Sequence, residues 1–375
     1  MIKVGITGQS GFMGTHLFNF LNLKKNDIIL IPFEDKYFED DNQLRKFVND
    51  CDAIVHLAAM NRHGVPQVIY DTNIKLVSQL IQAMEETGSR LHVLFSSSTQ
   101  EESDNLYGKS KHDGRMLFEQ WAQRNQARFT GFVIPNVFGP FGNPYYNSVV
   151  ATFCHQLTHN EQPQILVDAN LKLIYINELV VLFYKKIINT DPISDVTRYN
   201  VPHTSENKVS EILKLCENYK KLYFEQHSFP DLDSPFKVNL FNTFRSYIDH
   251  SSYYPVLLKK NTDQRGAFIE TIRTSIGGQF SFSTTVTGVT RGNHYHTRKV
   301  ERFIVIKGKA VIELRRIGTS EKLHFELDGE NPSFVDMPVW YTHNITNIGK
   351  DELITLFWIN EFFYPDDPDT YFEEV

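Results

Sequence analysis

Thr7-Gly-Gln-Ser-Gly-Phe-Met-Gly14 follows a short apolar run at residues 2–7 and precedes a helical pattern through Leu17 and Leu21. Glycines at this spacing allow a tight turn, a close backbone approach to a pyrophosphate, and close packing of a helix on a strand. The helix N-terminus adds oriented N–H groups for the anion. The stretch therefore predicts a dinucleotide site. The residues expected along the cofactor are Gly8, Gly11, Phe12, Met13 and Gly14.

Further apolar runs predict strands at residues 27–33, 53–59, 91–95 and 129–134, with a helix at 67–86. Such an alternation predicts an α/β, Rossmann-like, doubly wound parallel sheet that binds its ligand beyond the carboxyl ends of the strands. Two residues on this edge, Ala58 and Ala59, are small enough to leave room for the adenosine half of a cofactor.

The segment Phe33-Glu-Asp-Lys36 ends the second predicted strand. It offers acids that suit the ribose of NAD and a base that suits the phosphate of NADP, so it does not decide between these cofactors. Asn73, early in the helix at 67–86, reads as a solvated polar residue.

Candidate catalytic residues lie in Leu94-Phe-Ser-Ser-Ser98 and Tyr107-Gly-Lys-Ser-Lys111. A tyrosine four residues before a lysine on a predicted helix shares a face with it. The phenol titrates at about pH 10, and we expect the nearby cation to lower its pKa. Ser98, Tyr107 and Lys111 could then protonate a carbonyl oxygen while a hydride reaches carbon. The Tyr–Lys spacing alone occurs by chance in many helices. Here it follows a predicted strand whose carboxyl end lies at the same edge of the sheet as the glycine turn.

Composition limits the class of protein. The chain has 375 residues, 41% of them hydrophobic and 22% charged, which suits a globular protein of two domains. Its net charge of −7 implies no general attraction to nucleic acid or membrane, and no apolar run approaches the ~20 residues of a membrane helix. Cys51, Cys154 and Cys216 form no C-x-x-C pair and read as buried residues of a reducing compartment. We expect a cytoplasmic protein that begins directly with a strand.

After about residue 248 the pattern changes to closely spaced alternating strands, which predicts a C-terminal all-β domain of the sandwich or barrel kind. We therefore expect domains at residues 1–248 and 249–375. The β domain contains Gly288-x5-His294-x-His296-x4-Glu301-x6-Gly308 and Pro338-x-Trp340-x2-His343-x3-Asn347. These spacings match the two motifs of the cupin barrel, with Trp340 where the motif has glycine. Three histidines and one glutamate predict a zinc site at His294, His296, Glu301 and His343. A lone H-x-H would instead favour a histidine-bearing surface strand.

Residues 1 to about 245 resemble an extended short-chain dehydrogenase/reductase (SDR) of the nucleotide-sugar type. The matching pieces are T-G-x-x-G-x-x-G, H-L-A-A at 56–59, the serine-rich strand end, Y-x-x-x-K and P-N-V-F-G-P at 135–140. The resemblance implies catalytic roles for Ser98, Tyr107 and Lys111, with Lys111 also at the cofactor, and places Asn136 and Asn147 near the sugar nucleotide. The chain departs from the family pattern at Ile134, at residues 176–178 and in the short interval from Ser98 to Tyr107.

Over its whole length the chain resembles the bifunctional UDP-sugar epimerase/reductases of UDP-N-acetyl-L-fucosamine synthesis for bacterial capsule and O-antigen. Asp263-Gln-Arg-Gly-Ala-Phe-Ile-Glu270, G-N-H-Y-H and the closing residues 368–375 carry this likeness. It implies that the cupin domain epimerises C3 of a UDP-linked 2-acetamido-2,6-dideoxy-4-hexulose. The SDR domain then reduces C4 with NADPH to give UDP-N-acetyl-L-talosamine. It also implies zinc and a homodimer.

The residues leave other interpretations open. The cupin domain could serve only for dimerisation, or the chain could be a cofactor-sensing binding protein without turnover. An intact Ser98, Tyr107 and Lys111 set argues against the sensor, which has no need of it. If the cupin is catalytic, its candidate proton carriers cannot be ranked from sequence. They are Tyr295, Lys299, Asp336 and Tyr341.

Overall fold

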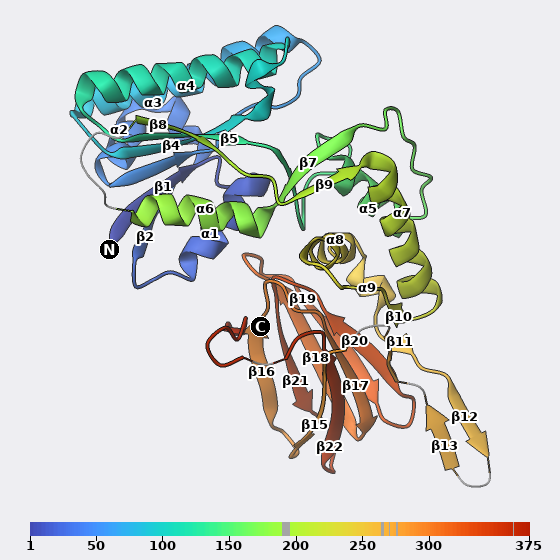
Figure 1. Cartoon of the computed structure of the whole chain (residues 1–375). Helices are drawn as coiled ribbons and strands as arrows, with labels where there is room; N and C mark the ends of the chain where they lie inside the picture. The colour runs from blue at the N-terminus through green and yellow to red at the C-terminus, as the bar shows by residue number, and fades with distance from the viewer. Residues whose placement is uncertain (190–195, 264–265, 270, 275–276, 363) are drawn as a thin grey trace. The chain divides into compact units, whose positions relative to one another are not determined.

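The computed structural model describes residues 1–189, 196–263, 266–269, 271–274, 277–362 and 364–375 (Figure 1). The chain forms two compact units, Met1–Val149 with Ala169–Lys208 and Val150–Asp168 with Val209–Val375. Segments 150–168 and 209–248, expected in the N-terminal domain, thus group with the C-terminal strands. The division into functional domains 1–248 and 249–375 stays a prediction. Residues 264, 265 and 270 of the D-Q-R-G-A-F-I-E stretch lie outside the described residues.

A six-stranded, all-parallel sheet forms the centre of the first unit, in the order β2-β1-β3-β4-β5-β8. The chain moves from β1 to β2 on one side and then crosses to β3 on the other, so the strand order switches at β1, as in doubly wound sheets. The Rossmann-like fold expected from sequence is confirmed. The strands are β1 (Ile2–Thr7), β2 (Ile28–Ile31), β3 (Ala53–His56), β4 (His92–Ser98), β5 (Phe129–Ile134) and β8 (Val196–Asn200).

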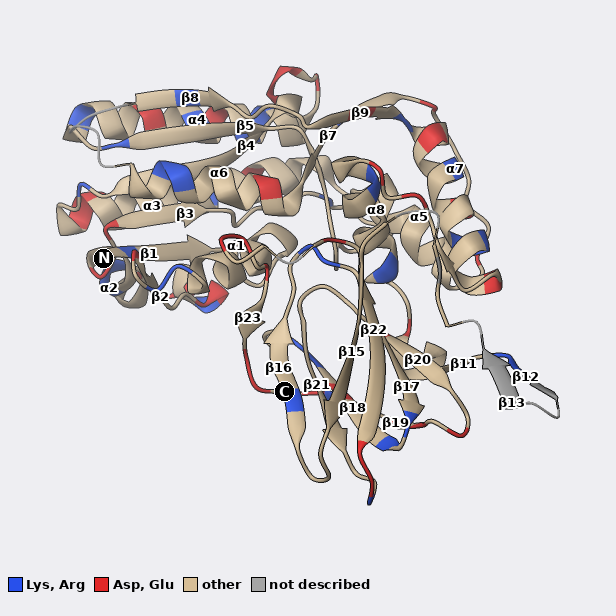
Figure 2. Ribbon diagram, turned by 60° about the horizontal axis from the view of Figure 1, so that its bottom comes forward, with Lys and Arg blue, Asp and Glu red and all other residues tan. Residues whose placement is uncertain are grey.

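Helices cover both faces of this sheet, with α3 and α4 on one side and α1 and α6 on the other (Figure 1). The central strands β3, β4 and β5 contain no Asp, Glu, Lys or Arg and are tan throughout in Figure 2, because both faces are buried. Gly88 ends α3 in the left-handed conformation, with φ 65°, as its position predicts. The helices are α1 (Phe12–Asn22), α2 (Asp41–Asn49), α3 (Pro66–Thr87), α4 (Leu106–Asn125) and α6 (Ile176–Ile188).

A small sheet of order β6-β7-β9 completes the first unit. Its strands are β6 (Asn136–Phe138), β7 (Asn170–Tyr175) and β9 (Ser205–Lys208). β6 begins two residues after β5 ends, so the P-N-V-F-G-P segment leaves the carboxyl edge of the parallel sheet directly.

Two five-stranded sheets form the β part of the second unit, in the orders β11-β20-β17-β22-β15 and β19-β18-β21-β16-β23. Both are antiparallel, and an apolar core between them draws side chains from each. This is the expected all-β double-sheet fold. The strands are β11 (Val256–Leu257), β15 (Gln279–Thr285), β16 (Thr290–Tyr295), β17 (Glu301–Lys307), β18 (Lys309–Arg316), β19 (Lys322–Asp328), β20 (Ser333–Met337), β21 (Tyr341–Asn347), β22 (Leu353–Ile359) and β23 (Tyr371–Phe372).

Shorter elements accompany these sheets. The strand pairs are β10 (Ser228–Phe229) with β14 (Arg273–Thr274) and β12 (Lys260–Asp263) with β13 (Gly266–Ile269). The helices are α5 (Val149–Thr158), α7 (Val209–Tyr219), the π-helix η3 (Lys220–Glu225), α8 (Pro235–Arg245) and α9 (His250–Tyr253).

A buried ion pair between β17 and β20 contacts the helical segment, residues 209–248. Arg302 Nε and Nη2 lie 2.7 and 2.9 Å from the carboxylate oxygens of Asp336, and both side chains are shielded from solvent. Tyr223, of η3, donates a hydrogen bond to the same carboxylate. The Arg302 guanidinium also lies 4.5 Å from the ring centroid of Phe229. The helical segment is therefore part of the packing of the β unit.

The three cysteines are free and buried, as expected. Among the helices within the described ranges, none has both the length and the apolar character needed to cross a membrane.

Candidate functional site

The glycine turn packs tightly against the end of β3. Gly8 has φ 67°, and a Cβ there would lie 2.7 Å from the backbone nitrogen of Ala58. A Cβ on Gly14 would lie 2.2 Å from the carbonyl oxygen of Gly8, so α1 can approach the turn only with glycine there. The Ala58 amide also donates to Thr7 Oγ1 at 3.3 Å. Two strand ends are thereby held side by side, as the dinucleotide interpretation requires.

The other residues expected at the cofactor lie on this same edge and remain accessible. Gly11 is the exposed N-cap of α1 and provides no side-chain cap, which leaves the first N–H groups of the helix for an anion. Half-buried positions surround it. These are Gly8, Phe12, Met13, Ala58 and Ala59.

Acidic residues lie close to the glycine turn. The Ser10 hydroxyl donates to Asp35 at 3.4 Å, and Lys36 Nζ lies 2.7 Å from the Glu34 carboxylate. Arg62 donates from Nη1 to the carbonyl oxygens of Tyr145 and Tyr146, at 2.7 and 3.2 Å. Both basic groups, Lys36 and Arg62, therefore already have partners.

Ser98, Tyr107 and Lys111 converge beyond the end of β4. Ser98 is the last residue of β4, and Asn105 caps α4 by accepting from the Gly108 amide at 2.7 Å, which starts the helix beside it. The Ser98 hydroxyl is close enough to the Tyr107 phenol to influence its pKa. Lys111 Nζ donates to the Ser96 carbonyl at 3.0 Å and lies 5.8 Å from the centroid of the Tyr107 ring.

The pKa values in this group follow from burial. Burial, with a contribution from Tyr146, raises the pKa of Tyr107 to about 12, although the nearby Ser98 hydroxyl opposes the rise. Burial lowers the pKa of Lys111 to about 8, while the charge of Glu101 acts in the other direction. The expectation that Lys111 depresses the pKa of Tyr107 is wrong. Desolvation dominates, and the ammonium is directed at the Ser96 carbonyl.

The two asparagines expected near the sugar nucleotide are exposed. Ser98 pairs with Ile134 across the parallel sheet, and Asn136 follows two residues later. Asn136 Nδ2 donates to the Lys172 carbonyl at 3.4 Å. Asn147 directly follows Tyr146, whose phenol is close enough to Tyr107 to affect its pKa. Both asparagines thus lie on segments that border the Ser98–Tyr107 group.

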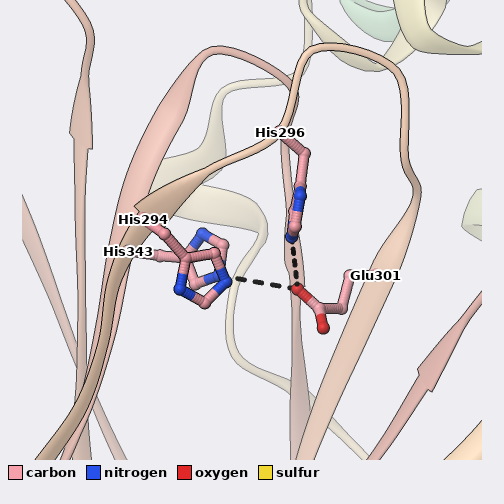
Figure 3. A group of neighbouring side chains, drawn as sticks. All are labelled: His294, His296, Glu301 and His343. Atoms are coloured by element: carbon pink, nitrogen blue, oxygen red, sulfur yellow. Dashed lines mark hydrogen bonds and ion pairs between the residues drawn. The ribbon is translucent and has the colours of Figure 1, made fainter. Parts of the chain in front are cut away.

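Three strands bring the predicted metal ligands together (Figure 3). His294 lies on β16 opposite His343 on β21, and Glu301 begins β17. His296 Nε2 and His343 Nε2 are 3.1 and 3.5 Å from Glu301 Oε2. The ligand atoms of all four residues lie within 4.8 Å of one another. An N₃O donor set of this size suits zinc.

Hydrogen bonds and charges prepare this group for a cation. His296 Nδ1 donates to the Asp369 carbonyl at 2.5 Å, which directs its Nε2 toward Glu301 and the other predicted ligands. Burial and the two neighbouring histidines lower the pKa of His294 to about 4. Burial would raise the pKa of Glu301, but the hydrogen bond from His296 and the neighbouring His343 bring it well below its usual range. A neutral imidazole and an ionised carboxylate are the forms that bind metal.

Comparisons with known proteins match the whole chain. A family model described as "NAD dependent epimerase/dehydratase family" matches residues 4–201, more than half of the chain, and a "Polysaccharide biosynthesis C-terminal domain" matches residues 261–371. The UDP-2-acetamido-2,6-beta-L-arabino-hexul-4-ose reductase of Pseudomonas aeruginosa is 34% identical over 99% of this chain and 98% of its own length. The crystal structure of the capsular polysaccharide assembling protein CapF from Staphylococcus aureus is 33% identical, with a TM-score of 0.63, and covers 100% of both chains.

This chain is a CapF-like member of the NAD dependent epimerase/dehydratase family. The structure of RMD from Pseudomonas aeruginosa, complexed with NADPH, covers 66% of the chain and 99% of its own, at 18% identity and a TM-score of 0.56. That likeness supports the fold alone.

Sequence reasoning missed a polar link in this CapF-like protein. Asn73, read as solvated, is buried. It donates to the Met60 carbonyl at 3.0 Å and to Ser110 Oγ at 2.9 Å, and it accepts from the Met60 amide at 2.7 Å. Ser110 in turn donates to the Tyr107 carbonyl at 2.7 Å. Asn73 therefore connects the segment after β3 to the start of α4. Its position in the predicted helix did not indicate these hydrogen bonds.

The structure also separates the candidate proton carriers of the CapF-like β unit. Asp336 is held by Arg302, whose side chain faces away from that of the adjacent Glu301. Tyr295 alternates with His294 along β16 and stacks near Trp340. Asp336 is therefore excluded as a carrier at the metal ligands.

Two candidates remain to be placed. Lys299 Nζ donates to the Pro368 carbonyl at 2.6 Å and is buried. Tyr341 is two residues before His343 on β21, so it shares that face, and it packs against the core between the sheets.

Proposed function

We propose that this chain converts a UDP-linked 2-acetamido-2,6-dideoxy-4-hexulose in two steps, C3 epimerisation in the cupin part and C4 reduction with NADPH in the SDR part. The product is UDP-N-acetyl-L-talosamine, a precursor of UDP-N-acetyl-L-fucosamine for bacterial surface polysaccharide. The observation that carries the proposal is the convergence of Ser98, Tyr107 and Lys111 beyond β4 in a chain 34% identical over its length to a UDP-hexulose reductase. We expect the reaction in the cytoplasm, where UDP-sugars are made.

The cofactor fits the carboxyl edge of the sheet. The turn leaves no space for side chains at Gly8 and Gly14, and the N-terminus of α1 offers N–H groups to a pyrophosphate. We assign the adenosine side to Ala58 and Ala59, and the nicotinamide side to Lys111. When bound, the reduced nicotinamide supplies the hydride.

Tyr107 acts as the proton donor in this proposal. With a pKa of about 12 its phenol is protonated at neutral pH, as reduction of a ketone requires. The proton passes to the C4 oxygen as the hydride reaches C4, which leaves a secondary alcohol, and solvent returns a proton to the phenolate. Ser98 hydrogen-bonds the same oxygen, and Lys111 positions the cofactor beside it. Asn136 and Asn147 bind the sugar nucleotide.

Epimerisation must come first, because the C4 ketone makes the C3 proton acidic and reduction removes that ketone. A base in the cupin part takes the C3 proton, and an acid returns one to the opposite face. We infer that Tyr341 is one of these groups, since it shares the face of His343. Burial raises the pKa of Tyr341, which keeps its phenol protonated and able to donate.

Zinc fits the second site. The residues that would hold it are His294, His296, Glu301 and His343, and the His296 tautomer is already set by Asp369. An ion there would either stabilise the negative charge on an enolate oxygen or hold the three strands together.

We further propose a homodimer formed through β15. Among the described strands this one pairs only with β22, which leaves it at the edge of its sheet. Two outward side chains, Phe280 and Phe282, are 55% and 71% exposed. An exposed apolar edge strand is a surface that proteins normally cover. Light scattering tests this: Phe282→Ser should shift the chain toward monomer, whereas Val167→Ser, at another exposed position, should not.

Incubation of the 4-keto sugar in deuterated water tests the two-step reaction. Without reduced cofactor, the recovered sugar should gain deuterium at C3. With NADPH it should also become the C4 alcohol. Absence of both reactions, with the sugar bound, would contradict the proposed function.

A further inference from the structure

The carboxylate of Asp369 holds the loop that connects two of the metal-ligand strands. Its side chain is 1% exposed and accepts from the amides of Thr297, Arg298 and Lys299 at 3.0, 3.0 and 3.1 Å. The Thr297 hydroxyl adds a fourth hydrogen bond at 2.7 Å. Three successive N–H groups on one carboxylate form a strong, charge-assisted anchor. The loop therefore has one defined position as long as this carboxylate is present.

The backbone of the same residue reaches the metal ligands. The Asp369 carbonyl accepts the Nδ1 proton of His296, and His296 directly precedes the anchored loop, which leads into Glu301. The side chain of Asp369 thus fixes the loop, and its carbonyl fixes the orientation of one imidazole. A fixed tautomer and ring orientation of this kind raises the metal affinity of a histidine.

The residues that follow add a strand to the ligand-bearing β16. In β23, Tyr371 and Phe372 pair with Tyr295 and His294. The Glu373 amide donates to the Asn293 carbonyl at 3.0 Å, next to the bulge in β16. The C-terminal segment therefore contacts β16 on both sides of His294.

We propose that the C-terminal segment 366–373 is a clasp that positions His294, His296 and Glu301 for a metal ion, with Asp369 as its central positioning residue. The proposal rests on the metal site proposed above. Asp369 is not itself a ligand, because its carboxylate oxygens are directed at the amides of the loop. The role depends on residues about 70 positions apart in sequence, and it assigns a function to the closing residues of the chain.

Asp369→Asn is the variant that isolates the anchor. Asp369 has φ 41°, which asparagine tolerates well, and the two side chains have the same size. The change removes the negative charge and places an NH₂ group where amide donors converge. Asp366→Asn is the matched control, because Asp366 belongs to the same segment but is exposed. Zinc affinity of the full chain is measured by competition with a chromogenic chelator, and the Co²⁺-loaded chain is compared by its visible absorption spectrum.

Asp369→Asn should bind zinc about 10- to 100-fold more weakly than the parent chain and give an altered Co²⁺ spectrum, while Asp366→Asn matches the parent. Thermal unfolding of the metal-free variants shows whether the change is merely destabilising. If Asp369→Asn melts lower but keeps the parent zinc affinity and Co²⁺ spectrum, the clasp is overturned. If the parent chain itself binds no zinc, the proposed metal site fails first and the clasp with it.

Discussion

Replacement of Tyr107 by phenylalanine tests the proposed reductase most directly. The phenol is the group that we expect to donate a proton to C4, and its ring packs at the start of α4, where phenylalanine has the same shape. The variant loses a hydroxyl group but no buried charge, so folding and cofactor binding should persist.

The expected loss of activity follows from the position of that proton. Because burial holds the pKa of Tyr107 at about 12, the group is fully protonated at pH 7, and its whole contribution as an acid disappears. General acid catalysis contributes about 10²- to 10⁴-fold, so kcat/KM for NADPH oxidation should fall by that factor, which is about 3 to 5 kcal/mol of transition-state stabilisation.

Tyr70→Phe is the matched control. This variant also loses a phenol hydroxyl, which donates to Asp113 at 2.8 Å on the outer part of α4. The activity of Tyr70→Phe should stay near that of the parent. Both variants should still exchange the C3 proton of the keto sugar in deuterated water, because the cupin part is unchanged. Near-parent turnover in Tyr107→Phe would refute its role. If Tyr107→Phe binds the sugar but exchanges no C3 proton, epimerisation does not occur in the cupin, which would then serve only for dimerisation or docking.

Three further outcomes are expected. The parent should contain about one zinc ion per chain by elemental analysis, and a His294→Ala, His343→Ala double variant should contain almost none; full metal content in that variant would show that the ligand set is wrong. The buried His56 has its pKa lowered from 6.5 to about 3, first by burial and then by Lys111, so the unfolded chain binds a proton that the folded chain does not. Stability should be fully present above about pH 6.5 and fall by up to about 1.4 kcal/mol per pH unit below it, as thermal unfolding from pH 7 to pH 5 can measure. NADPH should be preferred over NADH in kcat/KM, and Asp35→Asn should increase that preference by removing a negative charge beside Ser10; an NADH preference in the parent would show that the acids dominate.

Local patterns predicted the elements that carry each site. The run at residues 129–134 matches β5 at both ends, because a continuous apolar run of this length marks a buried strand in the local sequence. The grouping of the four predicted ligands was also predictable, because histidines two residues apart on an extended chain point to the same side.

Interactions between distant segments were not predictable. Asn73 was read as solvated, and Asp336 as a possible proton carrier, because their partners Ser110 and Arg302 lie more than 30 residues away with no shared period. The pKa of Tyr107 was expected to fall, since sequence shows a nearby lysine but not the extent of burial. A single sequence records which groups are near along the chain and leaves the desolvation of each group open.

The buried Arg302–Asp336 pair has a consequence for recombining such chains. A fragment of residues 250–375 keeps both charges but loses Tyr223, which donates to Asp336, and Phe229, whose ring lies 4.4 Å from that of Trp358. The pair would become a surface ion pair worth about 0–1 kcal/mol, and an apolar face would meet water. Grafting the cupin sheets onto another reductase should therefore yield an insoluble product unless the graft also brings the helical segment from residue 209 onward.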